Sequence, residues 1–469
     1  MKVVLVSTYD LGHQPFGLAS PAAWLREAGA SVTCIDLAVE ALKKQAVQSA
    51  ALVAIYLPMH TATRLASALL PRIKALNPRA HLCCYGLYAP MNEAFLRRLG
   101  VRTVLGGEFE AGLASLYARL AAGGPGAPAE PQSEPVVSFA KLQFRVPDRT
   151  GLPPLSGYAH LELGDGERRT AGYTEASRGC KHMCRHCPVV PVYGGRFRIV
   201  QRDVVMEDIR RQVAAGARHI TFGDPDFFNG VGHALRLVAA LHRAFPNVSY
   251  DATIKVEHLL KHARHLPTLA ATGCLFVTTA VESIDDDVLR LLDKGHTRAD
   301  FVRVAGLARD AGLTLSPSFM PFTPWTSLRG YRDLLALIAE LDLIDHVAPV
   351  QLAIRMLVPA GSRLLDLAAL APFLDGYDDA ALSHRWSHPD PEADRLHARV
   401  CEIVAKGEAR GASRRQTFAE IWRAAHRACG AAAPAPPQPR TKVDEIPVPR
   451  LSEPWYCCAE PTEGQFARI

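Results

Sequence analysis

The sequence has no uninterrupted apolar run of about 18 residues, the length that a membrane-spanning helix needs. The opening segment MKVVLVSTYD also lacks the longer apolar region and the small-residue cleavage site of a signal peptide. We therefore expect a cytoplasmic protein without a membrane partner. The 469 residues carry a formal charge of +6 that is spread along the chain, which is too modest to indicate nucleic acid as an obligate partner.

The eleven cysteines do not indicate a disulfide framework, because the chain shows no export signal. They indicate metal or redox chemistry instead. Cys83 and Cys84 are neighbours on an expected strand, so their side chains should point to opposite faces and belong to the core. Cys457 and Cys458 are also adjacent, and a bridge between them would be strained, since consecutive Cα atoms are ~3.8 Å apart and relaxed disulfides need ~4.4–6.8 Å. That pair reads as two thiols, a redox switch or two ligands for a soft atom.

The composition, 48% hydrophobic and 21% charged, is that of an ordinary globular protein, and the length allows two or three domains. Residues 1–121 alternate short apolar runs with segments of helical periodicity. The expected strands are VVLVS, VTCIDL, LVAIYL, HLCCYG and RTVLGG. This alternation predicts a doubly wound parallel sheet, with any ligand at the carboxyl ends of its strands.

A second alternation, from about 170 to 357, predicts six βα units and hence a partial barrel, again with chemistry at the strand carboxyl ends. The expected strands lie near GYTEAS, HITFGD, VSYDAT, FVTTAVE, LTLSPSFM and VQLAIRML. We divide the chain into an N-terminal α/β domain at 1–121, a linker at 122–165, a partial barrel at 166–390, a helical extension at 391–430 and a tail rich in proline and alanine at 431–469.

The strongest motif is RGCKHMCRHCPVV, which spaces Cys180, Cys184 and Cys187 as C-x3-C-x2-C after the first barrel strand. Three thiolates can hold three corners of a [4Fe–4S] cluster, which normally takes four cysteines. One iron would then stay open for an exogenous ligand. The alternative is a zinc site in which His182 or His186 is the fourth ligand.

The cysteine spacing followed by six βα units resembles the radical SAM superfamily. The resemblance implies that S-adenosylmethionine (SAM) chelates the open iron and is cleaved reductively at a C–S bond, with electrons from an external donor such as flavodoxin or ferredoxin. It also implies SAM-contacting residues in the segments TFGDPDF, AVESIDD and IRMLVPAG. These are Gly223 and Asp224 for the amino group, Glu282 or Ser283 for the ribose, and Arg355, Met356 and Leu357 for the adenine. TFGDPDF departs from the common GGE form at this place.

The N-terminal domain resembles the cobalamin-binding domain that precedes the barrel in one large radical SAM subgroup. A base-off site would carry D-x-H-x-x-G after the first strand. Here Asp10, His13 and Gly17 occur in DLGHQPFG, with one extra residue in each gap. The resemblance therefore implies a cobalamin-binding-like fold, leaves cobalamin as a possible cofactor, and makes His13 a doubtful cobalt ligand.

The tail segment YCCAEP resembles a narrow radical SAM group named for a CCAEP or CUAEP tail. Selenocysteine in relatives marks the position of Cys458 as reactive. The group is similar to the radical SAM enzyme of arsinothricin biosynthesis, which moves the 3-amino-3-carboxypropyl group of SAM onto arsenite. The resemblance thus implies a transferase in which Cys457 and Cys458 bind arsenite, its small-molecule substrate, as two adjacent thiolates can hold one soft atom.

Four further residues follow expected strand ends and are candidates for the substrate pocket. They are Lys255, Glu257, His258 and Trp325. A helix start and a rigid proline turn would equally explain them. Two other functions stay open for the whole chain: a cobalamin-dependent methyltransferase or other 5′-deoxyadenosyl-radical enzyme, and a non-enzymatic metal- or cobalamin-binding sensor.

Overall fold

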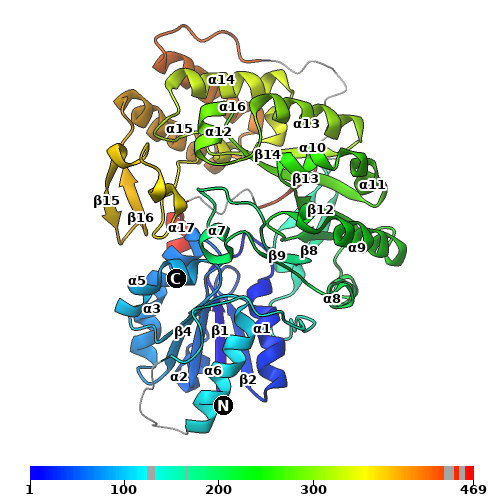
Figure 1. Ribbon diagram of the computed structural model, residues 1–469, viewed down its shortest axis with the longest axis vertical. Coiled ribbons are helices and arrows are strands. Elements are labelled where there is room, and N and C mark those ends of the chain that lie inside the picture. The colour runs from blue at the N-terminus through cyan, green and yellow to red at the C-terminus, as the bar shows by residue number, and fades with distance from the viewer. Residues whose placement is uncertain (124–131, 165, 438–447, 454–459) are drawn as a thin grey trace.

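The chain folds around two β-sheets in a computed structural model that describes residues 1–123, 132–164, 166–437, 448–453 and 460–469. The N-terminal part, in blue, lies below the barrel part, which is mainly green, and the helices within residues 391–428 lie in the upper part of the view (Figure 1). The N-terminal sheet orders its strands β2-β1-β3-β4-β5-β6, all parallel. These are β1 (Lys2–Ser7), β2 (Ser31–Asp36), β3 (Leu52–Tyr56), β4 (His81–Tyr85), β5 (Thr103–Gly107) and β6 (Val137–Ser138).

Helices cover both faces of this sheet, which is why its central strands are fully buried. On one face lie α1 (Phe16–Glu27) and α6 (Phe109–Gly123), and on the other α2 (Lys44–Ser49), α3 (His60–Leu76), α4 (Tyr88–Met91) and α5 (Glu93–Arg98). Cys83 belongs to the core under α1 and α6, whereas Cys84 belongs to the core under α3. The prediction that this pair splits between two faces is confirmed.

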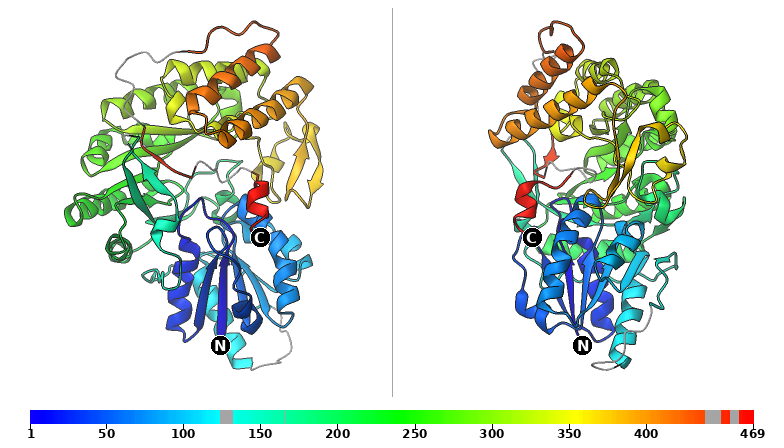
Figure 2. Two further views of the ribbon diagram at one scale, coloured as in Figure 1. Left: turned by 180° about the vertical axis from the view of Figure 1, so that it is seen from behind. Right: turned by 90° about the vertical axis from the view of Figure 1, so that its left-hand side faces the viewer.

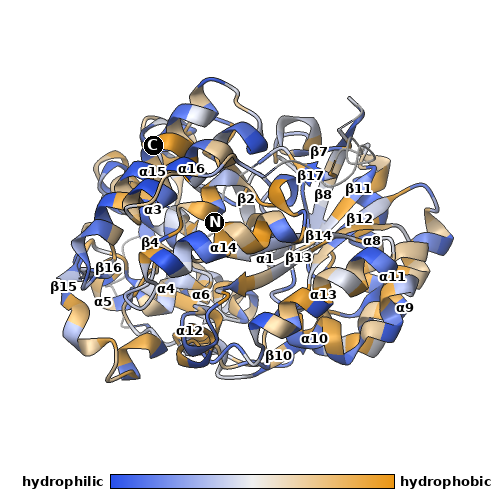
Figure 3. Ribbon diagram, turned by 90° about the horizontal axis from the view of Figure 1, so that it is seen from above, coloured by the Kyte–Doolittle hydropathy of each residue, from blue (hydrophilic) through white to orange (hydrophobic). Residues whose placement is uncertain are grey.

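The second sheet has the order β14-β13-β12-β11-β8-β7-β17. Its parallel strands are β8 (Arg168–Thr174), β11 (His219–Phe222), β12 (Ser249–Thr253), β13 (Cys274–Glu282) and β14 (Thr314–Phe319), and β7 (His160–Glu162) and β17 (Arg450–Leu451) extend it antiparallel. The crossover helices are α8 (Arg202–Ala214), α9 (Val231–Ala244), α10 (Val256–Lys261), α11 (Leu266–Ala271), α12 (Asp286–Leu291), α13 (Arg298–Asp310) and α14 (Leu328–Glu340). α9, α11 and α13 each carry hydrophilic and hydrophobic residues, as amphipathic helices on a sheet should (Figure 3).

Five of the six expected barrel strands are regular, and the sixth is reduced to a single parallel bridge between Phe322 and Arg355. The segment before that bridge, Pro349–Leu352, forms a 3-10 turn. In this turn the Gln351 and Ala353 N–H groups donate to the Ala348 and Val350 carbonyls at 2.9 and 3.0 Å, so they do not join a ladder. The α/β class with a doubly wound sheet and a partial barrel is nonetheless confirmed.

Smaller elements complete the chain. They are β9 (Ser177–Gly179) paired with β10 (Phe197–Ile199), α7 (Val189–Tyr193), the hairpin β15 (Leu374–Asp378) and β16 (Ser383–Trp386), and α17 (Glu463–Phe466). The two helices expected within 391–429 are α15 (Pro391–Ala409) and α16 (Arg414–Ala428), which pack on the outside of the barrel. In the part of the chain that the structure describes, no helix is both long and apolar enough to cross a membrane.

A buried ion network joins the two parts of the molecule at Arg178 on β9. Its guanidinium lies 2.6 Å from a carboxylate oxygen of Glu110, 2.7 Å from Glu175 and 3.4 Å from Glu108. Glu108 precedes α6 and Glu110 lies in its first turn, and both side chains are fully buried. The same guanidinium lies against the rings of Phe16, Phe109 and Phe144. The N-terminal domain is therefore attached two residues before Cys180, the first cysteine of the motif.

Candidate functional site

The cysteine motif forms the loop between β9 and α7. Gly179 enters this loop with φ +73°, and a Cβ there would lie 2.4 Å from the Tyr193 ring and 2.5 Å from the Arg196 carbonyl oxygen. Glycine is therefore required at this position. Within the loop, the Cys187 N–H donates to the Cys184 carbonyl at 3.2 Å, which keeps these two residues in a tight turn.

The thiols of Cys180 and Cys187 both lie close enough to Cys184 for its charge to affect their pKa values. Burial raises the pKa of Cys187 to about 12, with a further contribution from Cys184. Burial also raises the pKa of Cys180. Such thiols stay protonated without a metal, and a bound metal would ionise them and release their protons. The cysteines outside this loop in the described ranges lie on β2, β4, β13 and α15 and directly after α16. A set of three soft donors in one short loop fits three corners of an iron–sulfur cluster.

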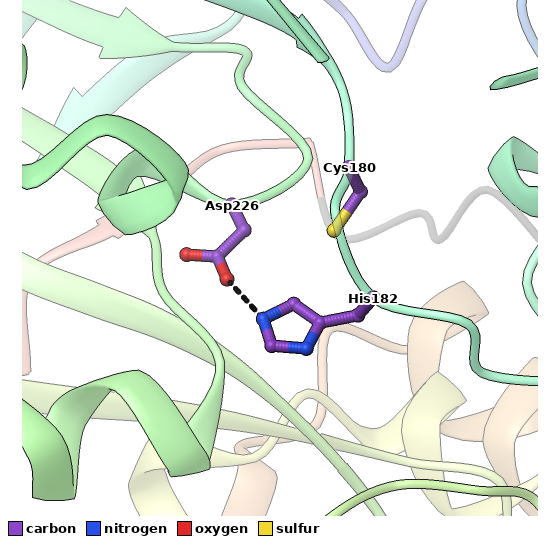
Figure 4. A group of neighbouring side chains, drawn as sticks. All are labelled: Cys180, His182 and Asp226. Carbon is purple, nitrogen blue, oxygen red and sulfur yellow. Dashed lines mark ion pairs between the residues drawn. The ribbon is translucent and has the colours of Figure 1, made fainter. Parts of the chain in front are cut away.

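His182 lies beside the motif with its ring turned toward Asp226. The ligand atoms of Cys180, His182 and Asp226 lie within 4.8 Å of one another, and His182 Nε2 is 3.4 Å from Asp226 Oδ2 (Figure 4). The second histidine of the motif, His186, faces Glu282, with Nε2 3.2 Å from Oε1. Each histidine that the zinc alternative needs is therefore already paired with a carboxylate.

Three of the expected pocket residues meet His182 at the carboxyl end of β12. Lys255 Nζ lies 3.2 Å from His182 Nδ1 and 3.2 Å from Glu257 Oε2. His258 Nδ1 lies 2.6 Å from Asp226 Oδ2, and its ring centroid is 4.6 Å from that of His182. Burial raises the pKa of Asp226, but the bonds with His182 and His258 outweigh it and leave that pKa below its usual value. The result is a connected group of charges against the cysteine loop.

Trp325 lies away from this group. Its Nε1 donates to the Ala369 carbonyl at 3.3 Å, and its ring packs with the apolar cluster around Met320 and Trp386. These contacts suit the role of a rigid turn after β14.

Gly223 and Asp224 follow β11 directly. A Cβ at Gly223 would lie 1.8 Å from the Tyr173 hydroxyl, so only glycine fits there. The buried Asp224 carboxylate accepts from the Ala176 N–H at 2.9 Å and from the Ser177 hydroxyl. Burial raises the pKa of Asp224 to about 7. Asp224 therefore holds the strand that leads into the cysteine loop, and a contact with the SAM amino group stays a prediction.

Glu282 ends β13 with φ +68°, beside a register shift in the pairing with β14. Its buried carboxylate accepts from His186 at 3.2 Å and faces Lys294 Nζ at 3.5 Å. Burial alone would raise the pKa of Glu282. The charges of Lys294 and His186 have a larger opposite effect and lower this pKa to about 2. The neighbouring Ser283 hydroxyl accepts from the Asp285 N–H at 3.1 Å. The structure thus assigns Glu282 a partner in the cysteine loop, and its bond to a ribose stays a prediction.

The predicted adenine segment lies at the bridge to Phe322. Arg355 pairs with Asp394 at 2.6 Å and stacks 3.6 Å from the centroid of Trp386. Met356 is buried, and its backbone N–H donates to the Phe322 carbonyl at 2.8 Å. Leu357 is half-buried. The tail pair Cys457 and Cys458 lies outside the described residues.

Sequence reasoning missed Asp226, which links His182 to the loop after β11, and Lys294, which pairs with Glu282 at the end of β13. Asp226 stands two residues after the predicted Asp224 in TFGDPDF, so the segment was recognised and its pairing was not. Lys294 carries no local signal, because its partner Glu282 is 12 residues away.

Comparison with known proteins agrees with this geometry. Residues 174–336 match the family model described as the Radical SAM superfamily. The cobalamin-dependent enzyme OxsB has the same fold, with a TM-score of 0.66 and 15% identity over 87% of this chain and 67% of that one. The methyltransferase TsrM from Kitasatospora setae aligns with a TM-score of 0.67 and 16% identity over 92% of this chain and 96% of that one.

Two curated relatives match shorter stretches. A tRNA-2-methylthio-N(6)-dimethylallyladenosine synthase from Chlorobium luteolum is 31% identical over 163 residues, which is 32% of this chain and 35% of that protein. A hopanoid C-3 methylase from Methylococcus capsulatus is 25% identical over 151 residues, which is 32% of this chain and 29% of that protein. The chain thus spans about a third of the length of these relatives.

The three-cysteine loop beside a partial parallel barrel agrees with the match of residues 174–336 to the radical SAM superfamily model. Both observations support the expectation of an enzyme that uses a [4Fe–4S] cluster and S-adenosylmethionine.

Proposed function

We propose that the chain transfers a carbon group from S-adenosylmethionine to a small-molecule acceptor. The observation that carries this proposal is the loop of three neighbouring thiols, Cys180, Cys184 and Cys187, within the residues that match the superfamily. When bound, the cluster supplies the electron that cleaves a C–S bond of SAM, and an external donor such as flavodoxin or ferredoxin replenishes it.

The chain's own residues hold the cysteine loop and a set of charges beside it. Glu282 fixes His186 between two of the cysteines, and Asp224 fixes the strand before the loop. Lys255 Nζ lies 3.2 Å from His182 Nδ1, and His182 Nε2 faces Asp226 Oδ2 at 3.4 Å. These contacts orient His182, and the ammonium of Lys255 lies beside the loop, where it suits a ligand carrying a carboxylate or another anionic group.

The finer proposal for the acceptor is trivalent arsenic. The CCAEP tail supports this proposal, because it resembles the tail of a radical SAM group that is similar to the arsinothricin enzyme. Cys457 and Cys458 would then be the thiolates that bind arsenite. In the overall balance the arsenic lone pair forms the carbon–arsenic bond, the C–S electrons leave with 5′-methylthioadenosine, and one proton is released. The overall transfer therefore consumes no net electron, because an electron that starts the cleavage is recovered when the reaction is complete.

Cobalamin-dependent methyl transfer is the second candidate. It is favoured by the likeness in fold to TsrM and OxsB, whose structures contain cobalamin. TsrM is a radical S-adenosylmethionine methyltransferase and OxsB is a cobalamin-dependent radical enzyme, so the shared two-part fold is compatible with this chemistry.

The nucleoside product separates the candidates. The reconstituted protein is incubated anaerobically with reductant, S-adenosylmethionine and arsenite, and the products are identified by mass spectrometry. We expect 5′-methylthioadenosine that depends on arsenite and an arsenic product containing the aminocarboxypropyl group. S-adenosylhomocysteine would instead support methyl transfer, and 5′-deoxyadenosine an adenosyl-radical reaction. Arsenite binding that survives in the Cys457→Ser, Cys458→Ser double variant would contradict the assignment of the thiol pair.

A further inference from the structure

The described parts of the C-terminal tail are attached to the rest of the chain on both sides of residues 454–459. Before this segment, β17 pairs with β7, and the Ser452 N–H donates to the His160 carbonyl at 2.8 Å. After it, α17 lies beside the N-terminal domain, where the red helix meets the blue part of the ribbon (Figure 2). A tail that composition alone predicts to be unable to fold by itself therefore makes specific contacts at both ends.

Glu453 is the first contact with the N-terminal domain. Its Oε1 accepts from the Tyr9 hydroxyl at 3.0 Å. Its side chain also packs against Gly12, where an added Cβ would lie 2.8 Å from the Cβ of Glu453. Tyr9 and Gly12 both belong to the loop that follows β1.

Glu460 is the second contact. Its Oε1 lies 3.1 Å from Nε2 of His60, whose side chain is 1% exposed, and its other oxygen pairs with Arg64. His60 begins α3, four residues after β3 ends. The pKa of Glu460 is lowered because the bonds with His60 and Arg64 outweigh the effect of burial.

The last residues of the chain make a third contact. Arg468 Nη1 donates to the Ala38 carbonyl at 2.6 Å, and Ala38 lies in the turn after β2. The terminal Ile469 is 8% exposed and belongs to the apolar core between the sheet and α3. An apolar C-terminal residue in this core is a docked end and not a solvated one.

These three contacts lie on the loops that follow β1 and β2 and on the first turns of α3, which follows β3. In the sheet order β2-β1-β3, the chain moves from β1 to opposite sides for β2 and β3, so the crevice between β1 and β3 is the topological switch point. Ligands of open α/β sheets bind in that crevice, outside the carboxyl ends of the strands. The tail contacts therefore surround the place where an N-terminal domain of this type would hold its ligand.

The rest of this edge is covered by the barrel part. The loop after β4 and the described end of the linker pack against α7, through Leu87, Val137 and Phe139. The Tyr193 hydroxyl at the end of α7 donates to the Glu108 carboxylate after β5 at 3.4 Å. His13, the doubtful cobalt ligand, lies with its ring centroid 4.6 Å from that of Tyr173 on β8. A flat ligand such as a corrinoid would have to displace some of these contacts.

We propose that the switch point of the N-terminal sheet is a binding site for the chain's own C-terminus, and that a corrinoid and the C-terminus exclude each other there. Tyr9 and His60 provide the two donors that select Glu453 and Glu460, one carboxylate on each side of the crevice. This inference is independent of the acceptor and of the C–S bond that is cleaved.

Hydrogen exchange and cobalamin binding by the full-length apoprotein test it together. In the wild-type chain, we expect protected amides at Ser452 and in residues 463–469. The Glu453→Gln, Glu460→Gln double variant removes both carboxylates, and we expect these amides to exchange about tenfold faster, because two charge-assisted bonds are weakened. The control is Glu463→Gln, which removes one carboxylate by the same type of substitution at an exposed position in α17 and should leave exchange unchanged.

Hydroxocobalamin is then added to each protein, and the amount retained after gel filtration is measured by absorbance. The double variant should retain about tenfold more than the wild type at limiting protein, in proportion to the open population. Equal retention by the two proteins would overturn the exclusion, and so would retention by the wild type with unchanged protection of residues 463–469. Unprotected tail amides in the wild type, or a double variant that exchanges like Glu463→Gln, would overturn the docking itself.

Discussion

Replacement of Arg178 by methionine should destabilise the joint between the two domains more than any surface substitution. Arg178 is the cation shared by Glu108, Glu110 and Glu175, and the first two carboxylates are fully buried. Methionine keeps much of the apolar contact with Phe16, Phe109 and Phe144 but leaves the carboxylates without their partner. Removal of one member of a buried ion network typically costs about 3–5 kcal/mol.

The cost should depend on pH in a defined direction. Burial already raises the pKa of Glu108 to about 7 and raises that of Glu175, although Arg178 opposes both. Without the guanidinium these pKa values rise further, so the folded variant can keep the carboxyls protonated at low pH. The destabilisation should therefore be smaller at pH 5.5 than at pH 8.

Thermal unfolding of the reduced apoprotein measures this effect. The matched control is Arg211→Met on α8, which removes an exposed pair with Glu207, where the N–O distance is 3.0 Å, and should cost about 0–1 kcal/mol. We expect a fall in Tm of roughly 6–20 °C for Arg178→Met at pH 8, from the cost of about 3–5 kcal/mol and a scale of about 2–4 °C per kcal/mol for a domain of 150–250 residues. A fall equal to that of the control, or equal falls at both pH values, would refute the reasoning.

Three further predictions concern Glu108, the cysteine loop and Gly223. Glu108→Gln should remove a loss of stability that the wild type shows as pH rises. The folded pKa of Glu108, about 7, lies above the ordinary 4.5, so the stabilisation is complete below pH 4.5 and is lost as pH rises through 7, by roughly 2–3 kcal/mol. Urea midpoints at pH 5 and 8 measure this loss, and an unchanged pH dependence in the variant contradicts it. Replacement of any one loop cysteine by alanine (Cys180→Ala, Cys184→Ala or Cys187→Ala) should remove most of the bound iron and all SAM cleavage. The exposed control Cys401→Ser should keep both. Iron analysis would reject the assignment if one of the loop variants kept as much iron as the wild type. Gly223→Ala should weaken SAM binding at least about tenfold, because the added Cβ would lie 1.8 Å from the Tyr173 hydroxyl. The control is Gly232→Ala on α9, where the added Cβ meets only the end of Arg236 at 3.4 Å. Calorimetric titration with SAM compares the two variants, and equal affinities would remove Gly223 from the site.

The elements that follow from local periodicity could be predicted from the sequence. The five long strands of the N-terminal sheet are continuous apolar runs between helical segments, and these strands are present. β6 and β17 are each two residues long, so they carry no periodicity, and their pairing depends on strands far away in the chain. The expected sixth barrel strand was wrong although its local signal was strong. VQLAIRML has strand-like composition, but the 3-10 turn over its first residues leaves only one bridge.

The candidate site divides in the same way. The spacing of Cys180, Cys184 and Cys187 is a local property and was recognised directly. The partners of the histidines in the motif are not local: Asp226 comes from the loop after β11, and Glu282 from the end of β13. Sequence reasoning placed Glu282 near the ligand but could not show that its buried carboxylate already has two partners, His186 and Lys294.

The cluster held by three cysteines is the central claim, and spectroscopy of the reconstituted full-length protein tests it most directly. Anaerobic reconstitution should give about four iron and four sulfide per chain, and addition of S-adenosylmethionine should change the electron paramagnetic resonance spectrum of the reduced cluster, because one iron has no cysteine ligand. Zinc in place of iron, or a reduced cluster whose spectrum is the same with and without S-adenosylmethionine, would contradict the account.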